Sequence, residues 1–140
     1  MRSANEKRSY IMSKVGHKHT KPEKIVRQFL FKKGYRYRLH SKKLPGSPDI
    51  VLNKFRSVIF VNGCFWHQHS NCSKNLTPKT NLSFWKNKFE ANIKRDKSNI
   101  DLLMKDGWNV IIVWECQLTL KKRDKTLKEL IANLMSQLPL

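Results

Sequence analysis

Hydrophobic residues recur along this chain with two periods, one helical and one of simple alternation, and both predict local structure. A helical pattern begins at Thr20, which precedes Glu23 by the spacing of a capping box, and ends at Gly34. A longer pattern runs from Ser83 to about Asp106. A third has apolar residues at helical spacing between positions 127 and 135. The sequence therefore predicts three helices, of which the middle one is the longest.

Four shorter segments are typical of strands: residues 35–39, 49–52, 57–62 and 108–114. The first alternates polar and apolar residues, whereas the last two are apolar enough to be central strands. The expected order is helix, three strands, helix, strand, helix. Because the long helix forms a crossover, the last strand should run parallel to a neighbour. We predict an α/β (α+β) fold with one mixed sheet flanked by helices.

The chain divides into a short basic start and a longer patterned region. Residues 1–20 are polar and basic with little periodicity, so we expect a flexible arm that becomes ordered on its partner. Residues 21–140 should form one domain, because the chain is long enough for a single core and too short for two.

The net charge of the chain indicates which class of molecule it binds. Lysine and arginine number 29 against 10 aspartates and glutamates, which gives a formal net charge of +19. A polyanion is the expected partner, and nucleic acid is the first candidate, ahead of an acidic protein or an anionic membrane. The sequence has no apolar stretch of about 18 residues and no secretion signal at its start, so we expect an intracellular protein.

The chain has three cysteines, and each falls where it can bind zinc. Cys64, His69 and Cys72 lie close together in the sequence, and Cys116 follows much later. Three cysteines and one histidine form a closed tetrahedral set, which indicates a structural zinc rather than a catalytic one. His67 is an alternative ligand to His69, and spacing alone does not choose between them. Separate buried thiols, or a cysteine nucleophile beside a histidine, are the other interpretations.

A candidate catalytic group lies where two predicted strands begin and end. Asp49 stands at the start of an apolar strand, where a buried charge requires a partner or a cation. Mg²⁺ prefers oxygen ligands, so Asp49 and the backbone oxygen near Val61 are candidate ligands. An aspartate that only caps a turn is the ordinary alternative. The next strand ends at Asn62 and leads to His67, an imidazole that can accept a proton from water near neutral pH.

Glu23 and two acidic residues later in the chain are weaker candidates. Glu23 could assist from the first helix, but capping already explains it, so the functional interpretation is the weaker one. Asp96 follows an arginine in the basic helix, and Glu115 neighbours a proposed zinc ligand.

Aromatic and basic residues indicate contact with DNA. Apolar wedges can enter base steps and deform the duplex, and basic side chains at helical spacing can contact phosphates. Trp85 has an equally good interpretation as a core residue on its helix face. The candidate wedges are Phe65, Trp66 and Trp85, and the candidate phosphate contacts are Lys88, Asn92 and Arg95.

The motifs together resemble those of the very short patch repair endonucleases, and the resemblance spans nearly the whole chain. It includes R-S-Y-I-M, T-K-P-E, L-P-G-S-P-D-I-V, V-I-F-V-N-G-C-F-W-H-Q-H, F-W-K-N-K-F-E-A-N-I-K-R-D and G-W-N-V-I-I-V-W-E-C. The resemblance implies a restriction-endonuclease-like fold. It also implies a bacterial enzyme that nicks one DNA strand 5′ to the T of a T:G mismatch, formed when 5-methylcytosine deaminates.

The resemblance also implies residue roles and partners. Asp49 and His67 would carry a Mg²⁺-dependent cleavage with help from Glu23, and the aromatics would enter the duplex beside the mismatch. The zinc ligands would be Cys64, His69, Cys72 and Cys116. The enzyme would act as a monomer in the cytoplasm, at the nucleoid and without a membrane. It would be paired in function with a DNA cytosine-5 methyltransferase.

The sequence departs from the family pattern at Val61 and Asn62, where some members have Thr-His. Asn62 is still a candidate member of the catalytic set, although it cannot take a proton as an imidazole does. The Val61 carbonyl can still bind a metal ion. The spacing from His69 to Cys72 is also one residue longer than in some relatives. Two other functions fit the same features: a zinc-braced DNA-binding module without catalysis, and a general restriction-type nuclease.

Overall fold

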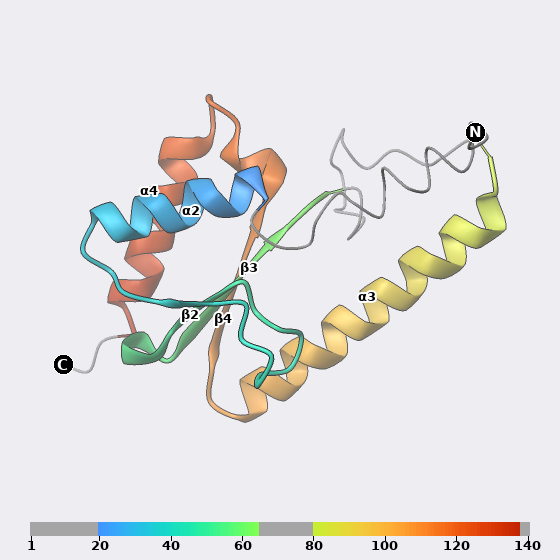
Figure 1. Cartoon of the computed structure of the whole chain (residues 1–140), viewed down its shortest axis with the longest axis horizontal. Coiled ribbons are helices and arrows are strands. Elements are labelled where there is room, and N and C mark those ends of the chain that lie inside the picture. Colours follow the sequence, from blue (N-terminus) through green and yellow to red (C-terminus); the bar gives the residue numbers. More distant parts are fainter. Residues whose placement is uncertain (1–19, 65–79, 138–140) are drawn as a thin grey trace, which may run out of the picture.

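The computed structural model describes residues 20–64 and 80–137, and it confirms the predicted mixed α/β fold (Figure 1). The predicted arm, residues 1–20, falls almost wholly outside this range. The described elements follow in the expected order. They are α2 (Lys21–Lys32), β1 (Arg38–Leu39), β2 (Ile50–Leu52), the 3₁₀ helix η1 (Asn53–Phe55), β3 (Ser57–Asn62), α3 (Leu82–Lys105), β4 (Asn109–Trp114), the 3₁₀ helix η2 (Glu115–Leu118) and α4 (Arg123–Met135).

The described strands form one sheet in the order β1-β2-β3-β4. β1 with β2 and β2 with β3 are antiparallel, and β3 with β4 is parallel, with Asn62 opposite Trp114. The parallel pair confirms the predicted crossover through α3. As a result, the carboxyl ends of β1, β3 and β4 and the start of β2 all lie at one edge of the sheet.

α2 begins where the sequence places its cap. The Glu23 amide donates a hydrogen bond to Thr20 Oγ1 at 3.3 Å, and Gly34, with a φ of 92°, follows the last turn. Val26 and Leu30 are fully buried on the inner face of the helix. Because Glu23 lies one turn before them, the first turn of α2 is fixed against the sheet.

Two apolar clusters cover the two faces of the sheet. Ile50, Leu52 and Ile59 pack with residues of α2 and α4 on one face. Val51 and Val58 pack with Leu103 of α3 on the other. The strands therefore have side chains buried alternately on both faces, which agrees with the apolar runs in their sequence.

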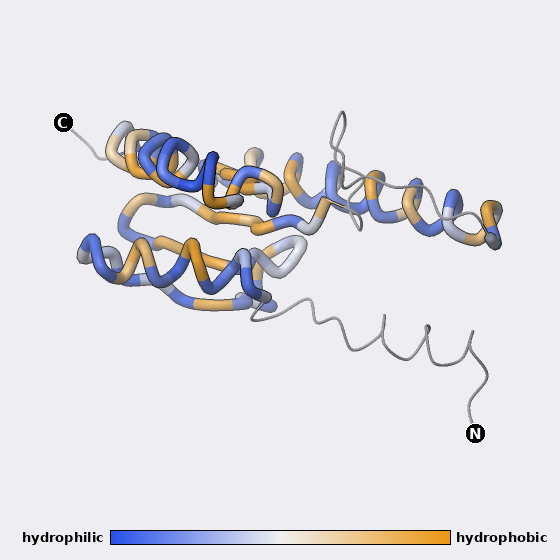
Figure 2. Tube along the Cα trace, turned by 90° about the horizontal axis from the view of Figure 1, so that it is seen from above, coloured by the Kyte–Doolittle hydropathy of each residue, from blue (hydrophilic) through white to orange (hydrophobic). Residues whose placement is uncertain are grey.

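The apolar residues at helical spacing in α3 are only partly buried. Phe84, Ile93 and Met104 are 58%, 47% and 61% exposed, whereas Phe89 and Leu103 are buried. The helix has 24 residues, and its N-terminal half extends well beyond the sheet (Figure 1). Figure 2 shows hydrophobic and hydrophilic turns alternating along its whole length. The helical period is therefore correct, but the sheet reaches only the C-terminal part.

The first strand is shorter than predicted. Only Arg38 and Leu39 pair with β2, because Tyr35 and Tyr37 pack against the α2 side of the core instead. Tyr37 also donates a hydrogen bond from its hydroxyl to the Arg27 carbonyl at 2.9 Å, which ties this segment to the helix.

No helix among the described residues is long and apolar enough to cross a membrane.

Candidate active site

Asp49 lies at the edge of the sheet where β2 begins and β3 ends. Its Oδ2 accepts a hydrogen bond from the Val61 amide at 2.7 Å. Pro48 before it is fully buried, so the chain is fixed where it enters β2. The amide and carbonyl of one strand residue face the same side, so the Val61 carbonyl also points toward the β2 edge. The structure therefore brings together the two residues that the sequence proposed as magnesium ligands.

His40 lies directly across the hairpin from Asp49. Leu39 pairs with Ile50, and the next step of the ladder is a hydrogen bond from the His40 amide to the Asp49 carbonyl at 3.0 Å. His40 has a φ of 48°, a left-handed conformation that costs a residue with a side chain about 1–2 kcal/mol. The surrounding hydrogen bonds maintain this conformation, and the His40 imidazole is held beside the Asp49 carboxylate.

Glu23 approaches the same point from α2 and is fully buried. Its Oε1 lies 2.6 Å from His40 Nε2, and its Oε2 accepts a hydrogen bond from Arg27 Nη1 at 3.0 Å. A buried carboxylate needs such partners, because an isolated charge is expensive to remove from water. The interpretation that capping alone explains Glu23 is therefore wrong. Its backbone amide meets the cap residue, whereas its carboxylate faces the strands.

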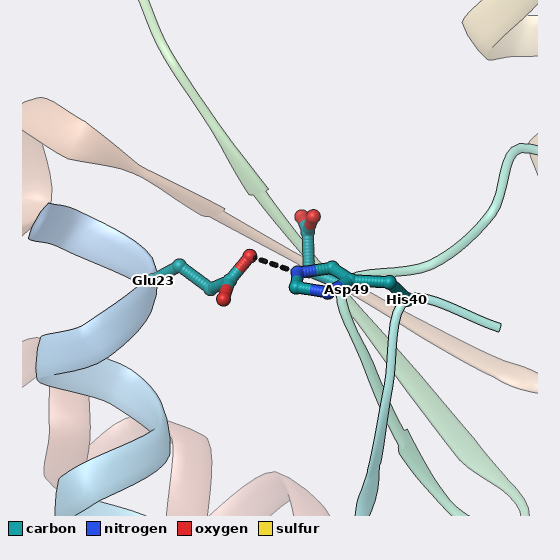
Figure 3. A group of neighbouring side chains, drawn as sticks. All are labelled: Glu23, His40 and Asp49. Carbon is teal, nitrogen blue, oxygen red and sulfur yellow. Dashed lines mark hydrogen bonds and ion pairs between the residues drawn. The ribbon is translucent and has the colours of Figure 1, made fainter. Parts of the chain in front are cut away.

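Glu23, His40 and Asp49 form one compact group (Figure 3). Their potential ligand atoms all lie within 4.8 Å of one another. Two carboxylates at a sheet edge suit Mg²⁺ or Mn²⁺, and an imidazole adds a nitrogen donor. The group therefore fits a divalent cation.

His40 is the residue of this group that the sequence did not indicate. One signal was present, because the alternation of residues 35–39 leads directly into it and Asp49 opens the next strand. Had these two strands been paired as a hairpin in the correct register, His40 would have fallen opposite Asp49.

Tyr37 supports the Glu23 side of the group. Burial raises the pKa of the Tyr37 phenol above its ordinary value of 10.0, while the nearby guanidinium groups of Arg27 and Arg36 oppose that rise. Its hydrogen bond to the Arg27 carbonyl holds the turn of α2 that carries Arg27. Tyr37 thus fixes the helix on which the Glu23–Arg27 pair is built.

Asn62 is the last residue of β3, one position after Val61, and it is partly buried. Its place in the catalytic set stays a prediction.

Two candidate zinc ligands lie at the ends of neighbouring parallel strands. Cys64 is buried, and Cys116 is partly buried. Each follows by two positions a residue of the Asn62–Trp114 pair. The Cys64 amide donates to Glu115 Oε1 at 3.2 Å, which joins the two strand ends. The two described members of the proposed four-ligand zinc set therefore lie at adjacent strand ends.

Several other candidates lie outside the described residues. These are Phe65, Trp66, His67, His69 and Cys72.

Three of the candidate DNA-contacting residues of α3, Trp85, Lys88 and Asn92, lie on its projecting N-terminal half, and Arg95 follows just beyond it. The Trp85 ring stacks on Phe89 at 5.7 Å and meets Phe84 edge-on at 5.3 Å. Lys88 Nζ lies 5.9 Å from the Trp85 ring, and Arg95 donates to Asn92 Oδ1 at 3.0 Å. Trp85 is partly buried, so it is neither a core residue like Phe89 nor fully exposed like Phe84.

Comparisons with known proteins agree on one family. A family model described as DNA mismatch endonuclease Vsr matches residues 3–74. The type II nicking enzyme V.NmeAIP of Neisseria meningitidis serogroup A is 51% identical over 112 residues, which cover 80% of this chain and 79% of that enzyme. The type II nicking enzyme V.XorIIP of Xanthomonas oryzae pv. oryzae is 48% identical over 118 residues, 84% of this chain and 86% of that enzyme. The DNA mismatch endonuclease Vsr of Escherichia coli is 37% identical over 130 residues, 93% of this chain and 81% of that enzyme.

Proposed function

Because this chain belongs to the Vsr family of DNA mismatch endonucleases, we propose that it nicks one DNA strand 5′ to the T of a T:G mismatch. The mismatch would arise when 5-methylcytosine deaminates, so a DNA cytosine-5 methyltransferase would be its functional companion. The enzyme would act as a monomer on DNA at the bacterial nucleoid in the cytoplasm, since nicking one strand needs no two-fold symmetry.

One observation carries the proposed chemistry: Asp49 is held against the Val61 amide, with the buried Glu23 close by. Oxygen atoms of Asp49 and Val61 would hold Mg²⁺. When bound, this ion would neutralise phosphate charge and make a bound water more acidic. The hydrogen bond from the Val61 amide fixes the orientation of the Asp49 carboxylate. Glu23 would orient the groups around the attacked phosphate.

Proton transfer is assigned to a residue outside the described range. His67 would accept a proton from the attacking water, because an imidazole exchanges protons near neutral pH. It follows β3 by five positions, after Asn62. Asn62 would at most donate a hydrogen bond near the scissile phosphate.

DNA would be held by the basic, aromatic half of α3 and by the segment after β3. Phe65, Trp66 and Trp85 would enter the base stack, and Lys88, Asn92 and Arg95 would contact phosphates. The projection of α3 beyond the sheet supports this role, because its exposed face is not required by the described core (Figure 1).

A structural zinc would fix the segment that carries His67. Its ligands would be Cys64, His69, Cys72 and Cys116. The joined ends of β3 and β4 support this assignment for the two cysteines within the described residues.

End-labelled T:G and matched C:G duplexes test the proposal directly. With Mg²⁺ present, the wild-type protein should nick the T-containing strand of the mismatch and leave the matched duplex intact. Asp49→Asn should lower the nicking rate at least about 100-fold, because it removes the carboxylate that would hold the Mg²⁺, and it should still bind the mismatch. Asp101→Asn, at an exposed position of α3, makes the same charge change away from the site and is the matched control.

The same assay distinguishes the other functions. Equal nicking of both duplexes would indicate a general restriction-type nuclease. Binding without nicking at any Mg²⁺ concentration would indicate a DNA-binding module, and that binding should weaken steeply with salt. Undiminished nicking by Asp49→Asn would refute the catalytic assignment.

A further inference from the structure

The imidazole of His40 is placed between two carboxylates that come from different elements. Glu23 approaches it from α2, with Oε1 at 2.6 Å from Nε2. Asp49 lies across the hairpin and is joined to His40 by a backbone hydrogen bond at 3.0 Å. The His40 side chain is 10% exposed, so it is enclosed rather than displayed on the surface. Figure 3 shows the ring beside Asp49, with one ring nitrogen directed at the Glu23 carboxylate.

We propose that His40 is a nitrogen ligand of the divalent cation held by Asp49, and that it widens the metal preference of the site from Mg²⁺ toward Mn²⁺. The inference rests on the proposed nuclease function, because it assigns a further residue to the same cation site. It differs from the oxygen-only set of Asp49 and Val61.

The spread of the donor atoms is close to what one ion requires. Two ligands on opposite sides of a cation are separated by about twice the metal–ligand distance, roughly 4.2 Å for Mg²⁺. The ligand atoms of Glu23, His40 and Asp49 lie within 4.8 Å of one another. One cation could therefore reach both an oxygen of Asp49 and a ring nitrogen of His40.

A chain of contacts orients the imidazole. Arg27 binds Glu23 Oε2 at 3.0 Å, and Glu23 in turn binds His40. Metal-binding histidines are commonly oriented by a neighbouring carboxylate, which fixes the ring and raises its strength as a donor. Because Glu23 binds His40 through Nε2, the nitrogen offered to the ion in this arrangement would be Nδ1.

The type of donor determines the expected metal preference. Carboxylate and carbonyl oxygens suit Mg²⁺ and Mn²⁺, whereas imidazole nitrogen favours transition metals over Mg²⁺. A nitrogen from His40 should therefore strengthen the binding of Mn²⁺ more than that of Mg²⁺. If His40 only orients Glu23 by hydrogen bonding, its loss should weaken both metals equally.

Electron paramagnetic resonance of Mn²⁺ bound to the full-length, zinc-loaded protein tests the assignment without measuring nicking. Continuous-wave titration gives the Mn²⁺ dissociation constant, and competition gives that of Mg²⁺. Pulsed measurements detect ¹⁴N coupled to the bound Mn²⁺. The variants are His40→Gln and His40→Asn. Tyr35→Phe is the matched control in the same segment, and Asp49→Asn is the binding-deficient reference.

The wild type and Tyr35→Phe should show ¹⁴N coupling, and both His40 variants should lose it. The Mn²⁺ dissociation constant should rise on the order of 10- to 100-fold in the His40 variants, with a smaller rise for Mg²⁺. His67→Gln should keep the coupling, which separates His40 from the other candidate imidazole.

Three results would overturn the assignment. They are wild-type Mn²⁺ without ¹⁴N coupling, coupling that survives His40→Gln, and no Mn²⁺ binding even with T:G duplex present. The first of these needs no variant to fold. Failure of the proposed function looks different, because ¹⁴N coupling without nicking of T:G duplex would leave His40 as a ligand and remove the enzyme activity.

Discussion

The Tyr37 hydroxyl donates a hydrogen bond to the Arg27 carbonyl, so one phenol joins the segment before β1 to α2. Tyr37→Phe should lower the free energy of unfolding at neutral pH by about 1 kcal/mol, because the Arg27 carbonyl loses this partner. Urea unfolding followed by circular dichroism measures the difference.

The effect of Tyr37→Phe on the free energy of unfolding should also depend on pH in the alkaline range. Burial raises the pKa of Tyr37 above 10.0 in the folded protein. The folded state therefore favours the neutral phenol, so the contribution to stability is present below pH 10.0 and is lost as pH rises through the folded pKa. The unfolding free energies of wild type and Tyr37→Phe should converge above that pH. Tyr35→Phe keeps Tyr37 and is the control from the same segment, so its free energy of unfolding should still fall as pH rises above 10.0. A difference between wild type and Tyr37→Phe that stays constant with pH would contradict the prediction.

Glu23 and His40 show how much of the candidate site could be predicted from local sequence. The local rule for capping correctly predicted that Thr20 would accept the Glu23 amide. It could not predict the partners of the Glu23 carboxylate, which are Arg27 one turn later and His40 on another element. His40 depended on the register of a hairpin and on a left-handed backbone, and neither is determined by nearby residues.

At the scale of elements, the loop before Asp49 is positioned by close packing of Gly46 against α3 and β3. Gly46 has a φ of 77°, and a Cβ there would meet Asn99 Cβ at 3.1 Å and Phe60 Cε1 at 3.2 Å. Gly46→Ala should destabilise the protein by about 2–4 kcal/mol, because it adds backbone strain and overpacking together. It should also reduce nicking by displacing Asp49, as measured by urea unfolding and single-turnover kinetics.

Gly107→Ala is the matched control for that substitution. Gly107 has a φ of 86°, but a Cβ there would meet nothing within 4 Å. This variant should therefore show only the cost of backbone strain, about 1–2 kcal/mol, with nicking retained. Equal effects of the two substitutions would show that the contact between Gly46 and Asn99 does not position the site.

The elements themselves were largely predictable, and their burial was less so. Periodicity located α3 within one residue at each end, and the crossover predicted the parallel pairing of β3 with β4. Periodicity could not show that the sheet covers only part of α3, since that depends on how far the strands extend. Phe84 and Ile93 are exposed for this reason, although their spacing matches that of core residues.

At the scale of the whole molecule, a shared zinc would join segments that are far apart in the sequence. Purified wild-type protein should contain about one zinc per chain, and Cys64→Ser and Cys116→Ser should each lose it. Removing the metal should lower the melting temperature by on the order of 10 °C, because metal binding to a folded site contributes directly to stability. Metal analysis and thermal unfolding measure both effects.

Resupply of zinc provides the control. Added zinc should restore the melting temperature and nicking of chelated wild type, but not of Cys116→Ser. A Cys116→Ser protein that retains the zinc content of the wild type would rule out Cys116 as a ligand.

Glu23, His40, Asp49 and Val61 belong to one continuous stretch of sequence that ends before α3 begins. Recombination between the genes of two relatives after residue 64 would therefore transfer this cation group whole, while exchanging the helix proposed to contact DNA. Specificity for new sequence contexts could then evolve with the cation group intact, provided that the incoming segment supplies the histidine proposed as the base, His67 here. The fit between Gly46 and Asn99 is where such a chimaera would have to remain compatible.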